Sequence, residues 1–134
     1  MKKLLTVTAV LEIATGVSLL TAPSFLAQLL LGAGLESPVA VLLGRIAGAA
    51  LLSLGLTCWL DRNRSLSGPV GLVGGLTAYN ALGASLLAHG GVADAMNGVA
   101  LWPACVAHVA LLIWCARYLL AVDRSSHTQI ESSR

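Results

Sequence analysis

The sequence predicts an all-α integral membrane protein, a four-helix transmembrane bundle with a short interfacial helix between spans 1 and 2. Three observations indicate this fold class. The 134 residues are 57% apolar and 10% charged, whereas a soluble domain carries about 25% charged residues, so the chain lacks the polar surface of a water-facing globule. Four apolar stretches are long enough to cross a bilayer. Most charged residues lie outside those stretches or at their ends.

The four predicted spans cover about residues 4–20, 39–60, 69–89 and 96–120. The run Met1-Lys2-Lys3 precedes the first span, but Glu12 in its middle and the lack of a small-x-small site argue against a cleaved signal. In the fourth span, Pro103 removes a hydrogen bond to the carbonyl of Val99 and is expected to kink the helix one turn inside its start. Asp94 is expected to cap this helix.

The segments between the spans differ in character. In residues 21–38, Pro23 suits a first helical turn, and Gly32 and Gly34 are stop signals. Ser24–Leu31 is therefore expected to be a short helix in the membrane interface, with Phe25 and the leucines in lipid. Glu36, Ser37 and Pro38 then start the second span. Residues 61–68 predict a charged turn and residues 90–94 a tight loop. Residues 123–134 form a polar, aperiodic tail that is expected to be cytoplasmic and disordered.

Basic residues that lie outside the spans or at the end of the fourth span all fall on one side of the predicted bundle. They are Lys2, Lys3, Arg62, Arg64, Arg117, Arg124 and Arg134. The first and third loops carry only Glu36, His89 and Asp94 as charged or titratable residues. The positive-inside rule then makes both termini cytoplasmic. Trp59, Trp114 and Tyr118 are expected at the inner interface and Trp102 and Phe25 at the outer one.

Glycines mark two helix faces suited to close packing. Gly44 and Gly48 form a Gly-x-x-x-Gly pair with Gly55 on the same face two turns later, and Gly71 and Gly75 form a second pair. Small residues let helix backbones approach closely in lipid. The pattern leaves open whether the neighbour is a helix of the same chain or of a second copy.

Polar side chains near mid-membrane predict a buried polar centre. On one face of the first span lie Thr8, Glu12, Thr15 and Gly16, and Arg45 borders the glycine groove of the second. Isolated charges at this depth cost about 3 kcal/mol each. Because the depths of Glu12 and Arg45 differ by only about 5–10 Å by helical rise, we expect the two to form an ion pair. The pair is either a structural pin or a site whose carboxyl exchanges protons.

Spans three and four add Tyr79, Asn80 and His108 to this centre. A hydrogen bond from His108 to Asn80, Tyr79 or a threonine is expected, because buried polar groups are paired. His108 shares a face with Cys105 and Cys115, but two further ligands for a metal are missing, and a second strong axial ligand for haem is missing too. We therefore predict no metal and no cofactor. Cys58, Cys105 and Cys115 contain no Cys-x-x-Cys pair and are interpreted as packing residues.

The first 60 residues resemble the small four-helix bacterial inner-membrane proteins loosely grouped as DoxX-like. The resembling features are Leu11-Glu12 with Thr15-Gly16, the Ala22-Pro23 elbow with Leu31-Gly32, the run Gly44-Arg45-Ile46-Ala47-Gly48, and Leu54-Gly55. The resemblance implies a four-helix bundle in the bacterial inner membrane and transfers no active-site residues. Small multidrug-resistance exporters also carry a lone Glu in their first helix, but residues 21–38 and Arg45 depart from their pattern.

No nucleotide-binding loop and no nucleophile constellation is present in the sequence, and no basic patch alternates with aromatics as nucleic-acid binding would require. We therefore predict no catalytic residues. The favoured function is that of a non-enzymatic accessory or ligand-binding subunit in contact with the lipid bilayer. The sequence leaves the oligomeric state open, and a homodimer and a larger membrane complex are both compatible with it. The alternatives are a small proton-coupled transporter or channel, dimeric through a glycine groove, and a membrane redox or quinone protein.

Overall fold

The computed structural model describes residues 1–63 and 70–132, with side chains described as far as residue 124. The described chain is all-helical, as predicted, with helices α1 (Lys2–Thr21), α2 (Pro23–Leu31), α3 (Pro38–Asp61), α4 (Val70–Val92) and α5 (Leu101–Ser132). Within these residues, four helices are long enough and apolar enough to cross a membrane: α1, α3, α4 and α5 as far as Arg124. The predicted number of membrane-length helices is confirmed.

Local signals set the ends of α2 and α3 where the sequence predicts them. Pro23 is the first residue of α2, and Gly32 ends that helix with φ +83°, a left-handed conformation that favours glycine. Ser37 caps α3, because its hydroxyl accepts a hydrogen bond from the Ala40 N–H at 3.1 Å, and Pro38 follows as the first helical residue.

The start of the fourth long helix corrects the sequence analysis. α5 begins at Leu101 rather than near residue 96, so Pro103 is its third residue. The first N–H groups of a helix have no intrahelical acceptor, so Pro103 costs no hydrogen bond there, and its position gives no reason for a kink. Asp94 lies outside the helix and does not cap it; its Oδ2 is 3.4 Å from His89 Nδ1. α4 itself extends to Val92, into the expected loop.

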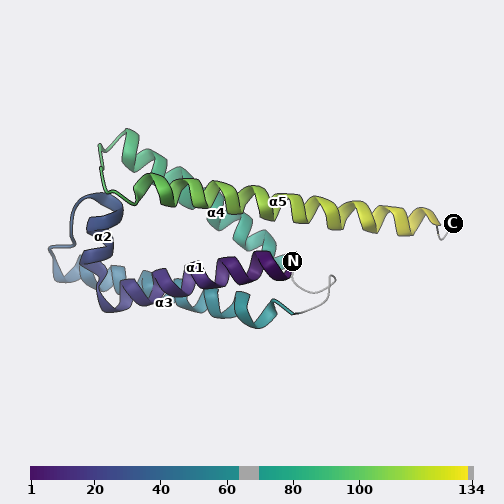
Figure 1. Ribbon diagram of the computed structural model, residues 1–134, viewed down its shortest axis with the longest axis horizontal. Coiled ribbons are helices and arrows are strands. Elements are labelled where there is room, and N and C mark those ends of the chain that lie inside the picture. The colour runs from purple at the N-terminus through teal and green to yellow at the C-terminus, as the bar shows by residue number, and fades with distance from the viewer. Residues whose placement is uncertain (64–69, 133–134) are drawn as a thin grey trace.

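The C-terminal tail is also different from the expectation. α5 continues to Ser132, so the structure describes a helix over residues 123–132, where the sequence predicts an aperiodic tail. Beyond Pro103 the sequence holds neither glycine nor proline, so no stop signal ends the helix. Figure 1 shows α5 extending well past the other helices. Most of the charged turn expected at residues 61–68 lies outside the described residues.

The helices form two antiparallel pairs, α1 with α3 and α4 with α5, and α2 crosses from the first pair to the second at one end (Figure 1). Glycines allow the close approach within the first pair. A Cβ added at Gly16 would lie 2.8 Å from the Gly48 carbonyl oxygen, and one at Gly55 would lie 2.9 Å from Ile13 N. The first glycine groove therefore packs within the chain, against α1.

The second glycine pair has no such neighbour. At Gly71 and Gly75 an added Cβ would meet nothing within 4 Å among the described residues. The Gly44 position meets Leu35 and Pro23 instead of a long helix. The structure thus assigns the α3 glycines to packing inside the chain and leaves the α4 pair exposed.

The two helix pairs meet at both ends of the molecule. At the end that holds the N-terminus, all four long helices contribute to one apolar core, made by Leu4, Leu5, Ala9, Cys58, Val73, Leu76, Leu111 and Cys115. At the other end, the loop before α5 docks on α2, because the Ala100 N–H donates to the Leu29 carbonyl at 2.9 Å. Gly98 lies directly against the backbone of Leu30, where no Cβ would fit.

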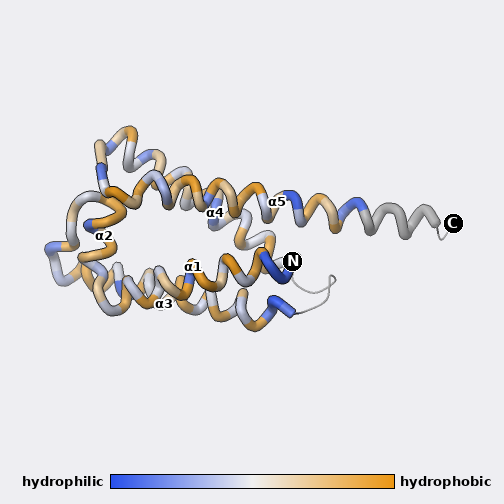
Figure 2. The backbone as a smooth tube through the Cα atoms, viewed as in Figure 1, coloured by the Kyte–Doolittle hydropathy of each residue, from blue (hydrophilic) through white to orange (hydrophobic). Residues whose placement is uncertain are grey.

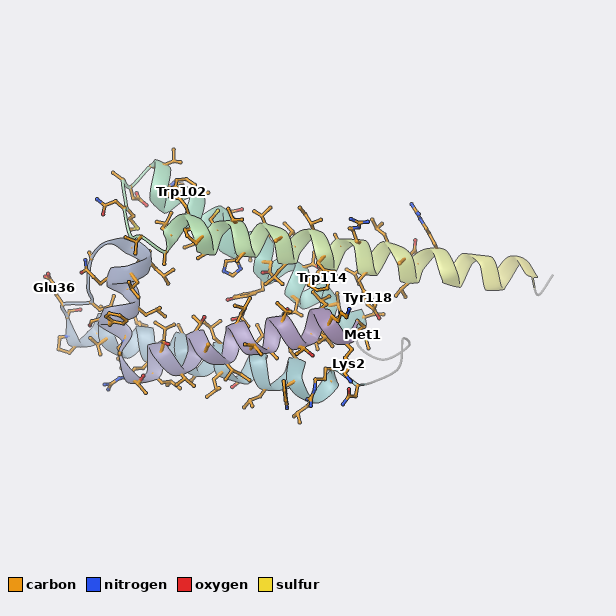
Figure 3. All side chains as sticks on the ribbon, viewed as in Figure 1. Met1, Lys2, Glu36, Trp102, Trp114 and Tyr118 are labelled. Atoms are coloured by element: carbon orange, nitrogen blue, oxygen red, sulfur yellow. The ribbon has the colours of Figure 1, made fainter. Side chains whose placement is uncertain are left out.

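Hydrophilic segments gather at the two ends of the bundle and along the exposed part of α5, and the stretches between are largely hydrophobic (Figure 2). In Figure 3, Glu36 and Trp102 lie at one end and Met1, Lys2 and Tyr118 at the other. The Tyr118 hydroxyl donates to Met1 Sδ at 3.1 Å, which joins α5 to the chain start at that end.

Candidate functional site: a cavity between the two helix pairs

A cavity of about 410 Å³ lies between the two helix pairs, bounded by α1, α2, α3, α4 and α5. Most of its walls are leucine and alanine. The polar side chains in the walls are those of Glu12, Thr15, Tyr79 and His108. The exposed residues Leu11 and Leu86 also line it, so the cavity reaches the apolar outer surface of the bundle. Its volume and composition are those of sites that hold small apolar molecules.

Glu12 supplies the one carboxyl group among the described residues that line the cavity. Its side chain is only 4% exposed, and the Tyr79 hydroxyl donates to its Oε2 at 3.2 Å. This hydrogen bond joins α1 to α4, and therefore one helix pair to the other. A carboxyl group in an apolar wall needs such a donor, because burial of an unpaired polar group is costly.

His108 lies on the opposite pair and is held by Asn80. The Asn80 Nδ2 group donates to the Leu76 carbonyl at 2.8 Å, so the Asn80 Oδ1 is the atom that lies 2.9 Å from His108 Nδ1. A carbonyl oxygen only accepts, and therefore Nδ1 of His108 carries the hydrogen. Nε2 is then the nitrogen with the free lone pair when the ring is neutral.

The imidazole ring is also fixed by its packing. Tyr79 meets it edge to face, with ring centroids 5.4 Å apart and an interplanar angle of 73°. On α4, Gly83 leaves the space that the ring occupies: a Cβ there would lie 3.1 Å from His108 Cε1. Gly83 was not among the predicted site residues, although a small residue one helical turn after Tyr79 is a detectable signal that a side chain packs beside the tyrosine.

Arg45 does not join this centre, so the expected Glu12–Arg45 ion pair is wrong. The Arg45 side chain is exposed whereas Glu12 is buried. Helix register explains the separation. Gly44, next to Arg45, packs against Pro23 beyond the end of α1, and Glu12 lies nine residues before Thr21, or about 13 Å along the α1 axis. Depth by helical rise within each span does not contain the point at which the two helices meet.

The two threonines of the predicted centre occupy different environments. Thr15 lines the cavity one turn after Glu12. Thr8 is fully buried one turn before Glu12, and its Oγ1 has no hydrogen-bond partner among the described residues. The structure therefore brings Glu12, Thr15, Tyr79 and His108 to one cavity, with Asn80 supporting His108 from behind, and places Thr8 and Arg45 elsewhere.

Helix α2 contributes to the site in a way that the sequence did not indicate. Leu26 and Leu30 line the cavity, whereas Phe25 is 64% exposed. The expectation that the α2 leucines all lie in lipid is therefore wrong for these two. Cys105, which shares the His108 helix, turns its Sγ to the Ala84 carbonyl at 3.6 Å.

Comparison of this chain with protein-family models, with curated proteins and with solved structures finds no match.

Proposed function

We propose that this chain is a multi-pass protein of the bacterial inner membrane that binds a lipophilic small molecule between its two helix pairs, as a non-enzymatic ligand-binding or accessory subunit. The observation that carries the proposal is the apolar cavity of about 410 Å³ with Glu12, Tyr79 and His108 in its walls. Cavities that bind small molecules combine apolar walls with a few fixed polar groups that orient the ligand. Membership of the DoxX-like group is part of the same proposal, and it does not indicate which ligand is bound.

The proposed orientation has the N-terminus in the cytoplasm. Lys2 lies at the end of the bundle that holds the N-terminus, and Glu36 lies at the other (Figure 3). Lys3 follows Lys2 in α1, and Arg62 directly follows α3, which ends at Asp61 on the side of the N-terminus (Figure 1). The positive-inside rule places the basic end on the cytoplasmic side. Because α5 runs antiparallel to α4 and returns to that end, the C-terminus is cytoplasmic as well.

The proposed entry route is from lipid. Leu11 and Leu86 both line the cavity and are exposed on surfaces that would face acyl chains. In this orientation α2 lies at the outer interface, with Phe25 toward lipid and with Leu26 and Leu30 closing the outer end of the cavity. A lipophilic ligand dissolved among the acyl chains then enters the cavity directly from the lipid.

Filling the cavity tests the proposal. Ala107 lines the cavity, and the next residue, Val106, is 66% exposed and outside it. The Ala107→Trp variant is expected to lose saturable binding of lipophilic probes by protein in nanodiscs, whereas Val106→Trp on the same helix is expected to keep it. Circular dichroism confirms that both variants fold. Equal binding by the two tryptophan variants would show that probes bind outside the cavity.

A second candidate function is that of a small proton-coupled transporter, and the position of Glu12 favours it. A carboxyl group in the wall of a cavity between two separate helix pairs is a group whose protonation can follow ligand entry and exit. This candidate predicts ligand-driven proton movement in sealed vesicles that Glu12→Gln abolishes. Binding without any flux in those vesicles would leave the ligand-binding subunit as the function.

A further inference from the structure

The cavity presents lone pairs to a ligand and few hydrogens. The Tyr79 hydroxyl has a single hydrogen, which it donates to Glu12 Oε2. The Nδ1 hydrogen of His108 is directed at Asn80 Oδ1, so Nε2 offers a lone pair. The second oxygen of Glu12 also accepts. Of these side chains, only Thr15 has a hydroxyl that can rotate either to donate a hydrogen bond to the ligand or to accept one from it.

The charged side chains of the cavity also favour a ligand that brings hydrogens and positive charge. Among the described residues that line it, Glu12 is the one acidic residue and none is an arginine or lysine. Among the described residues no basic side chain forms an ion pair with Glu12, since Arg45 is exposed and level with the far end of α1. A carboxylate in an apolar wall is stabilised most by a cation that enters with the ligand.

We propose that the ligand is a protonated amine on an apolar body, with its ammonium group between Glu12 and His108 Nε2. This inference rests on the proposed ligand-binding function and names the class of ligand. An ammonium group supplies both the hydrogens that these acceptors lack and the charge that Glu12 lacks. The leucines of α1, α2 and α4 then contact the apolar body, and a cavity of about 410 Å³ has room for a small molecule.

Asn80 is the positioning residue of this site. It holds the hydrogen of His108 on Nδ1 and so keeps Nε2 as the acceptor. Removal of the amide by Asn80→Leu frees the ring to carry its hydrogen on either nitrogen. ¹⁵N NMR of labelled histidine distinguishes the two tautomers, and the His108→Gln variant assigns the signal. We expect the Nδ1–H form in the unchanged protein and a mixture in Asn80→Leu.

Three probes with one skeleton test the ligand class: 4-phenylbutylamine, 4-phenylbutanol and 4-phenylbutanoate. Their affinities are measured with the full chain in phosphatidylcholine nanodiscs, and binding to empty nanodiscs is subtracted. We expect the amine to bind at least tenfold more tightly than the alcohol and the acid to bind most weakly. In Glu12→Gln the ratio of amine to alcohol affinity is expected to fall to about one, because the charge is gone while the size of the side chain is kept.

Glu36→Gln is the matched control, because it removes an exposed carboxylate at the outer end of the bundle. It is expected to keep the preference for the amine. If the alcohol binds and the amine binds no more tightly, or if Glu12→Gln keeps the preference, the amine assignment is overturned and the ligand-binding function stands. If none of the three probes binds saturably, the ligand-binding function itself is overturned, and the amine assignment with it.

Discussion

The packing of α1 on α3 is tight enough that one methyl group should separate the helices. A Cβ at Gly16 would lie 2.6 Å from Leu52 N and 2.8 Å from the Gly48 carbonyl oxygen. Both contacts are with backbone, which cannot rotate away. To restore ordinary contact at 3.4 Å, α1 must move from α3 by about 0.8 Å, which forfeits part of the van der Waals attraction along the interface.

The expected cost of Gly16→Ala follows from this displacement. Overpacking of this kind destabilises proteins by about 1–3 kcal/mol. The matched control is Gly75→Ala on α4, where an added Cβ meets nothing within 4 Å among the described residues. Alanine has a helix propensity better than that of glycine by up to about 1 kcal/mol, so the control is expected to be neutral or stabilising.

The assay is unfolding of the purified protein in mixed micelles with increasing sodium dodecyl sulfate, followed by circular dichroism. Gly16→Ala should unfold at a lower fraction of the denaturing detergent, and Gly75→Ala at the same or a higher fraction. Equal shifts for the two variants would refute the reasoning, because the close approach of α1 and α3 would then contribute nothing to stability.

Three further predictions concern the polar centre and the loop before α5. Glu12→Gln is expected to change the free energy of unfolding by less than about 1 kcal/mol, because an amide oxygen still accepts from the Tyr79 hydroxyl. Arg45→Gln is expected to change it by less than about 0.5 kcal/mol, because that side chain is exposed. A loss of about 3–5 kcal/mol in either variant would instead indicate a buried ion pair. Thr8→Val should stabilise the protein by about 1–2 kcal/mol in the same detergent titration, because it removes a buried hydroxyl that has no hydrogen-bond partner in the described chain. Destabilisation by Thr8→Val would show that the hydroxyl forms a hydrogen bond. Gly98→Ala should lower the midpoint of thermal unfolding, because the added methyl group would overlap the α2 backbone. Gly34→Ala should lower the midpoint less, because its Cβ would lie 3.7 Å from the nearest neighbour. Similar midpoints for the two variants would mean that the loop before α5 does not depend on the contact of Gly98 with α2.

Local features of the sequence determined the helices. Apolar stretches of membrane length predicted the four long helices, since hydropathy and length are properties of each segment alone. Pro23, Gly32 and the Ser37-Pro38 pair set helix ends through their own backbone preferences and capping hydrogen bonds. These signals act over a few residues, and a sequence displays them directly.

Tertiary structure alone decided which polar groups meet. The partner of Glu12 is Tyr79 rather than Arg45 because the contact of Gly16 with Gly48 fixes the register of α1 on α3 and leaves Arg45 at the far end. Docking of the loop on α2 likewise sets the start of α5, so that Pro103 falls in a first turn rather than inside a helix. Register between helices depends on contacts between residues far apart in the chain, and no periodicity within a single segment encodes it.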